Sequence, residues 1–246
     1  MKTVARLFCF GDKSILKDAC WCISYFCDAS DEQDERIQLI LDANFVPTLV
    51  SLVAGPTRNM IMPALRALGN LCTGSNEQTQ SVLACETFLP TLVKLLSTHQ
   101  DTQIRRETCW ILANIAACTQ AQVEMLIRAG ALETVWTMFQ NKTEADVVKN
   151  EIRWIVCNAI RTGHKQTCRE LADRGALDVI CSTLDNSSSG LVIGALESIQ
   201  KILGCSHSAV KMFEDRGGRQ TLNLLCHHHD TTVANVARRV LSGFEL

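Results

Sequence analysis

The chain has 246 residues, 47% of them apolar, so it can bury a core as one large domain or two ordinary ones. A net charge of −2 and a pI near 6.3 argue against a nucleic-acid-binding surface and favour basic partners. The cysteines lie mostly in apolar helical runs, which favours reduced, buried thiols over a disulfide framework, as for Cys20, Cys22, Cys72, Cys109 and Cys157.

The first ten residues do not make a convincing signal peptide, because their apolar run is short and ends at Gly11. No apolar stretch approaches the roughly 20 residues of a membrane-spanning helix, so we expect a soluble protein. Residues 4–10 fit the end of one helix and residues 14–28 fit the next. The chain is therefore expected to begin inside a repeat.

A similar apolar segment recurs through the rest of the chain, and successive copies start 43, 43, 45 and 42 residues apart. A shorter amphipathic segment precedes each copy, and a polar turn with a longer helix follows it, so each period predicts three helices. The first helices of the periods are expected near residues 36–43, 79–86, 123–130, 168–175 and 210–217. The second helices are expected near 44–53, 87–96, 130–139, 175–184 and 217–226.

Glycines and prolines fall where these helices should end and begin. Gly130, Gly175 and Gly217 stand where a first helix ends, a position that favours the left-handed conformation. Pro47 and Pro90 stand near the start of a second helix. Strand signals are nearly absent.

Pro63 lies near the start of a third helix, where a proline is tolerable in the first turn and costly further in. All-helical periods of about 40 to 47 residues indicate an armadillo or HEAT array, and three helices favour armadillo. We predict an all-α, right-handed armadillo-repeat solenoid of about five and a half repeats. Its single domain would comprise 1–29 (a partial repeat), 30–74, 75–118, 119–163, 164–204 and 205–246 (a capping repeat).

The third helices also share a polar and aromatic pattern. The segment RRETCWILAN places a carboxylate, an indole and an amide on one helical face, and NEIRWIVCN repeats the arrangement 44 residues later. In the aligned helices the tryptophan position holds Trp21, Arg66, Trp110, Trp154 and Gly194. The asparagine position holds Tyr25, Asn70, Asn114, Asn158 and Ser198, and the acidic position holds Asp18, Glu107 and Glu151.

Stacked helices about 10 Å apart would line these side chains along a groove. Amides can hold a peptide main chain, indoles can hold the stems of Lys or Arg, and carboxylates can receive the charged heads. The pattern predicts a site for an extended, basic peptide. The alternative is that Trp110 and Trp154 fill the core, which is less favoured because each repeated amide would then need a buried partner. Trp136 lacks such neighbours and is expected to be structural.

At these residues the chain resembles the armadillo domain of importin-alpha, through the segments DACWCISYFCD, PALRALGNLCTGSNEQTQ and RRETCWILANIAA. The resemblance runs along the whole chain and corresponds to the C-terminal half of that domain. It implies an adaptor in cytoplasm and nucleus that binds the nuclear localisation signals of cargo proteins for import. It also implies a minor signal-binding site formed by Arg66, Asn70, Thr73, Gly74, Thr79, Glu107, Trp110, Asn114, Glu151, Trp154 and Asn158, with Asn76 in place of a family Asp.

The resemblance implies that Asp18, Trp21, Tyr25 and Asp28 are a remnant of the family's major site. The rest of that site and the basic segment that recruits importin-beta are expected to lie upstream of Met1, so importin-beta binding is doubtful for this chain. The last repeat resembles the region used by the export receptor. The alternative function is an armadillo scaffold or truncated isoform that binds or sequesters partners without transport.

The run His227, His228 and His229 invites a metal site, with Cys226 adjacent and with Cys205 and His207 in a neighbouring loop. Consecutive histidines at a helix end point in different directions, and no CxxC pair supports zinc. The chain also lacks a P-loop, a dinucleotide fingerprint and a nucleophile elbow. We therefore predict no enzymatic activity, metal or cofactor, and neither nucleic-acid nor membrane partners.

Overall fold

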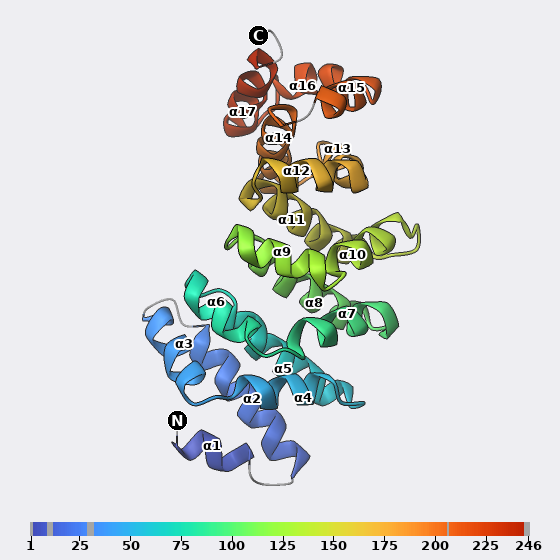
Figure 1. The fold of residues 1–246 in the computed structure, drawn as a ribbon. Helices are drawn as coiled ribbons and strands as arrows, with labels where there is room; N and C mark the ends of the chain where they lie inside the picture. Colours follow the sequence, from blue (N-terminus) through green and yellow to red (C-terminus); the bar gives the residue numbers. More distant parts are fainter. Residues whose placement is uncertain (1, 9–11, 29–31, 206, 244–246) are drawn as a thin grey trace. The chain divides into compact units, whose positions relative to one another are not determined.

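The computed structural model describes residues 2–8, 12–28, 32–205 and 207–243, which form helices and no strand (Figure 1). The helices follow one another as first, second and third members of a recurring triplet, which confirms the predicted three-helix period. None of the described helices by itself has the length and apolar character of a membrane-spanning segment.

Each class of helix agrees with its predicted segment. The third helices are α2 (Lys13–Cys27), α5 (Arg58–Leu71), α8 (Thr102–Ala116), α11 (Asp146–Thr162), α14 (Ser189–Leu203) and α17 (Thr231–Ser242). The first helices are α3 (Gln33–Asp42), α6 (Asn76–Leu83), α9 (Gln120–Arg128), α12 (Lys165–Leu171) with η1 (Ala172–Ala176), and α15 (His207–Asp215). The second helices are α1 (Lys2–Phe8), α4 (Val46–Val53), α7 (Phe88–Thr98), α10 (Ala131–Gln140), α13 (Leu177–Cys181) and α16 (Gly218–Leu225).

The chain divides into two compact units, Met1–Thr137 and Met138–Leu246, and the division falls inside α10. In the first unit α5 packs against both α2 and α8, and in the second α14 packs against both α11 and α17. A triplet buries its apolar face only by stacking on the next one, so the third helices carry the core of each unit. The predicted boundaries of the individual repeats stay a prediction.

Left-handed residues end several first helices, as predicted. Gly130, Gly175 and Gly217 have φ values of 72°, 101° and 74°, where a Cβ would be strained. Asn44 adopts the same conformation, with φ 55°, after α3. Asparagine tolerates this region better than most residues with a Cβ, which explains why no glycine is needed there.

Pro63 lies in the first half of a third helix, but beyond the first turn, where a proline is most easily tolerated. Helix α5 begins at Arg58, so Pro63 lies in the second turn, and it has no N–H to donate to the carbonyl of Asn59. The helix begins early because the carbonyl of Thr57 accepts the N–H groups of Met60 and Ile61 at 2.8 and 3.1 Å. One additional turn is thereby formed ahead of the proline.

The cysteines in the described ranges are free thiols. Cys20, Cys72, Cys109 and Cys157 are buried as predicted, whereas Cys22 is exposed, which corrects the expectation for that residue. Two residues along a helix correspond to a rotation of about 200°, so Cys22 faces away from the core that Cys20 enters. Burial raises the pKa of the Cys157 thiol to about 12, which keeps it protonated and unreactive.

Candidate functional site

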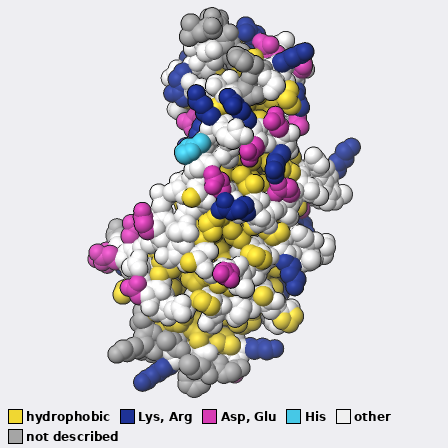
Figure 2. Space-filling model, in the orientation of Figure 1, with side chains coloured by type: hydrophobic (Ala, Val, Ile, Leu, Met, Phe, Trp, Pro, Cys, Tyr) yellow, Lys and Arg dark blue, Asp and Glu magenta, His cyan; other side chains and the backbone are white. Residues whose placement is uncertain are grey.

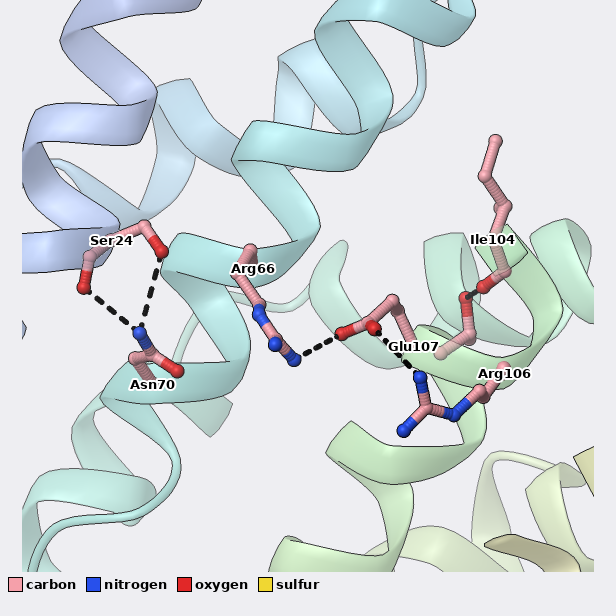
Figure 3. A network of polar contacts seen from close by, with 7 residues as sticks. Ser24, Arg66, Asn70, Ile104, Arg106 and Glu107 are labelled. Carbon is pink, nitrogen blue, oxygen red and sulfur yellow. Dashed lines mark hydrogen bonds and ion pairs between the residues drawn. The ribbon is translucent and has the colours of Figure 1, made fainter. Parts of the chain in front are cut away.

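Three predicted site residues form a compact cluster in the first unit, which we call the Trp110 cluster: Arg66, Glu107 and Trp110. Arg66 Nη1 on α5 donates to Glu107 Oε2 on α8 at 2.7 Å (Figure 3). The guanidinium carbon of Arg66 lies 5.0 Å from the centre of the Trp110 ring, within cation–π range. The spacing of three between Glu107 and Trp110 thus brings a carboxylate and an indole to the same guanidinium.

Glu107 is held by charge on both sides. Only 5% of the residue is exposed, and its second oxygen, Oε1, lies 3.8 Å from Arg106 Nη1 (Figure 3). A carboxylate with so little exposure requires such partners, because burying an unpaired charge is costly. The carboxylate predicted to receive a ligand's charged group is therefore already paired within the chain.

Gly69 provides the space for the Trp110 indole. A Cβ at position 69 would lie 2.2 Å from Cζ3 of the indole, well inside the distance at which carbon atoms repel. Gly69 follows Arg66 by three residues on α5, so both contact the same ring from one helix. The side of Trp110 that faces α5 is covered by these two residues, and the side chain as a whole is half-buried.

Asn70 uses its side chain to join two third helices. Its Nδ2 group donates to the carbonyl oxygen of Ser24 at 2.9 Å and to the Ser24 hydroxyl at 3.4 Å (Figure 3). The residue is 3% exposed, so this is the buried partner that a core amide requires. A direct contact of Asn70 with a peptide stays a prediction, and its observed contact supports the packing of α5 on α2.

Asn114 has a different environment. It is half-buried, and its buried Nδ2 group donates to no group in the part of the chain that the structure describes. A buried donor without an acceptor costs about 1–3 kcal/mol. An acceptor brought within reach of Asn114 Nδ2 would therefore be stabilising. A carbonyl oxygen from a ligand, met by rotation of the amide, would satisfy this group.

The predicted site residues that follow α5 differ in accessibility. Thr73 and Asn76 are exposed, and Gly74 is half-buried. The Thr73 hydroxyl donates to the carbonyl of Asn70 at 2.7 Å. Thr79 has no exposed surface, so in this arrangement it supports the start of α6 and does not reach the surface.

The four residues predicted as a remnant of a second site lie on and after α2. The rings of Trp21 and Tyr25 stack with centroids 5.7 Å apart and an interplanar angle of 20°. Tyr25 is 69% exposed, and Asp18 and Asp28 are exposed as well. They form a solvent-facing aromatic and acidic surface, whose assignment to binding stays a prediction.

The second matched set lies on α11, in the second unit. Glu151, Trp154 and Asn158 are all half-buried. The Trp154 indole faces glycines of α14, because a Cβ at Gly194 would lie 3.4 Å from the ring and one at Gly190 would lie 3.7 Å from it. These are ordinary contact distances, so the Trp154 ring packs against the backbone of α14 at these two glycines. Each compact unit thus carries one acid–indole–amide set.

The remaining candidates add no further site. Trp136 is 8% exposed, which confirms its structural role. Across residues 2–8, 12–28, 32–205 and 207–243, no group of three His, Cys, Asp or Glu side chains could hold a metal ion. His228 Nδ1 accepts the N–H of Asp230 at 3.0 Å. On the face shown in Figure 2, basic and acidic side chains intermingle over the second unit and hydrophobic ones gather over the first.

Comparison with known proteins agrees with the armadillo-type fold. The Armadillo/beta-catenin-like repeat family matches residues 33–73 and 75–117. The chain is 32% identical to importin subunit alpha-4 of Arabidopsis thaliana over 97% of this chain and 46% of that protein. It is 29% identical to importin subunit alpha-1b of Oryza sativa subsp. japonica over 100% of this chain and 47% of that protein.

The chain is an armadillo-repeat relative of the importin-alpha subunits. It spans about half the length of these two relatives. A solved designed armadillo repeat protein, in complex with the peptide (KR)4, matches it with a TM-score of 0.86 at 26% identity, over 98% of both chains. The predicted all-α armadillo solenoid is thereby confirmed.

Two buried glutamines link successive repeats of this importin-alpha relative, and sequence reasoning missed both. Gln78 Nε2 donates to the carbonyl of Asp34 at 2.7 Å, and Gln122 Nε2 donates to the carbonyl of Asn76 at 2.9 Å. Each glutamine is also the third residue of a first helix, where its side chain completes a capping box. The available signal was a Ser or Thr followed three residues later by Gln, recurring 44 residues apart.

Proposed function

We propose that the third helices bind extended, basic peptides, and that the protein is an importin-alpha-like adaptor for nuclear import. Its relationship to importin-alpha subunits supports an import adaptor or an armadillo peptide-binding scaffold. The (KR)4 peptide bound by a designed armadillo protein of the same fold supports a basic ligand. The proposed partners are cargo proteins with basic localisation signals, and the proposed location is cytoplasm and nucleus.

The Trp110 cluster is the observation that carries this proposal. In it an indole and the carboxylate three residues before it hold a guanidinium by a cation–π contact and a charged hydrogen bond. Glu151 and Trp154 have the same spacing on α11. We assign that pair to a Lys or Arg side chain of the peptide, with a cation–π contribution of about 0.5–2 kcal/mol.

The amides hold the main chain of the ligand. Asn114 and Asn158 each follow an indole by four residues, so the amide and the indole share a helical face. An Asn side chain offers one acceptor and two donors, which suits a peptide bond whatever its side chains. The buried, unpaired Nδ2 of Asn114 is the group that gains most from such a contact.

The test is the affinity of a fluorescently labelled, Lys/Arg-rich localisation peptide, measured by anisotropy with the purified chain. Trp154→Ala should weaken binding by about 1–3 kcal/mol, as truncations of central aromatic contacts do, with helicity unchanged. Asn114→Ala combined with Asn158→Ala should also weaken it. The matched control is Leu224→Ala, which removes an exposed apolar side chain of α16 and should leave affinity unchanged.

Two results would count against the proposal. One is a folded Trp154→Ala variant that binds as tightly as the parent chain. The other is equal affinity for a peptide of the same length in which Ser replaces every Lys and Arg. If the folded parent chain binds no basic peptide, the scaffold function without cargo binding becomes the better description.

A further inference from the structure

Arg66 stands at the tryptophan position of its repeat, where the following two repeats carry Trp110 and Trp154. It does not replace an indole as a binding surface. Its guanidinium instead reaches across to the next third helix, 5.0 Å from the centre of the Trp110 ring and 2.7 Å from Glu107. A cation of the chain itself therefore already lies over the Trp110 ring.

We propose that Arg66 competes with a ligand for Glu107 and the Trp110 ring, so that a basic peptide side chain binds these two groups only when Arg66 leaves. The inference rests on the proposed function, because it concerns the same class of ligand. It assigns to Arg66 a role in setting affinity and specificity at this repeat.

The charge balance requires displacement. The two oxygens of Glu107 already face two guanidinium groups, those of Arg66 and Arg106. A third cation beside them would be repelled by two positive charges, and Glu107 Oε2 already accepts a hydrogen bond from Arg66. A ligand cation therefore gains the full site only by taking the place of Arg66.

Displacement is feasible because Arg66 is not locked in the core. Its side chain is 41% exposed, so its guanidinium can turn into water, where ion pairs and stacking contribute little. The Glu107 carboxylate is not free to follow, since that side chain is 6% exposed. The Glu107 carboxylate is thus fixed in place, whereas the Arg66 guanidinium can be replaced by a cation of the ligand.

Trp154 provides the contrast within the same chain. The glycines Gly190 and Gly194 lie against its ring, and no cation stacks on it among the described residues. We therefore expect the parent chain to draw most of its binding energy from Trp154. Trp110 should contribute less until Arg66 is removed.

The experiment measures the affinity of the labelled Lys/Arg-rich peptide for Arg66→Ala. Removing the competitor should tighten binding about three- to tenfold, the equivalent of one cation–π contact together with a freed carboxylate. Arg58→Ala is the matched control, because it removes the same charge from the same helix and disrupts a pair with Asp101 instead. It should leave affinity unchanged.

A second comparison uses Arg66→Ala in a Trp110→Ala background. The gain in affinity should vanish there, since the site that Arg66 blocks no longer exists. Circular dichroism reports whether each variant is folded, and Arg66→Gln, which keeps a neutral donor for Glu107, replaces Arg66→Ala if that variant is not.

The outcomes separate this inference from the proposed function. If the parent chain binds and Arg66→Ala binds no tighter, the competitor role is wrong and the peptide-binding function stands. Equal gains in Arg66→Ala and Arg58→Ala, or a gain that persists without Trp110, would indicate a general effect of charge and overturn the competitor role. If neither the parent chain nor folded Arg66→Ala binds, both proposals are wrong.

Discussion

The contact between Gly69 and the Trp110 indole makes a sharp prediction for Gly69→Ala. Alanine in a helix interior is favoured over glycine by about 0.5–1 kcal/mol, so propensity alone predicts stabilisation. The added Cβ, however, would lie 2.2 Å from the indole. Relieving such overpacking typically costs about 1–3 kcal/mol, so we expect a net loss of about 1 kcal/mol in the free energy of unfolding.

The same substitution at Gly194 should have the opposite sign. A Cβ there would lie 3.4 Å from the Trp154 ring, which is ordinary contact, so the helix propensity gain of about 0.5–1 kcal/mol should remain. Urea unfolding followed by circular dichroism measures both variants, and tryptophan emission reports whether the indole moves. Equal stabilisation by Gly69→Ala and Gly194→Ala, with unchanged emission, would refute the packing of Trp110 on Gly69.

Two further predictions concern the linkage of repeats and acid stability. Gln122→Ala removes a buried hydrogen bond to the preceding repeat and should cost about 1–3 kcal/mol in urea unfolding, whereas the exposed Gln80→Ala should change little. A hydrogen bond from the Arg58 guanidinium, aided by N–H groups of the α8 cap, holds the pKa of Asp101 below its ordinary value. A lowered pKa stabilises the fold above the ordinary value, and this contribution is lost as pH falls through the folded pKa. The stability difference between the parent chain and Asp101→Asn should therefore shrink below about pH 4, and a difference constant with pH would contradict this.

Information local to one helix proved sufficient for much of the fold. The period of apolar residues identified the triplets, and Gly130, Gly175 and Gly217 marked helix ends correctly, because each signal depends only on neighbours along the chain. Two local predictions, the position of Pro63 within its helix and the burial of Cys22, differed from the structure. Helix α5 started earlier than Pro63 suggested, and Cys22 followed its helical face rather than its apolar neighbours.

The sequence by itself determined which side chains share a face, since helical geometry places Glu107 and Trp110 together whatever lies opposite. Only the tertiary structure decided their partners. Arg66 meets Glu107 from 41 residues away, and Asn70 meets Ser24 from 46 residues away. Periodicity orients a side chain but does not choose among the acceptors, rings and backbone groups that packing brings within its reach. That choice depends on how adjacent helices stack and on which buried group most needs a partner.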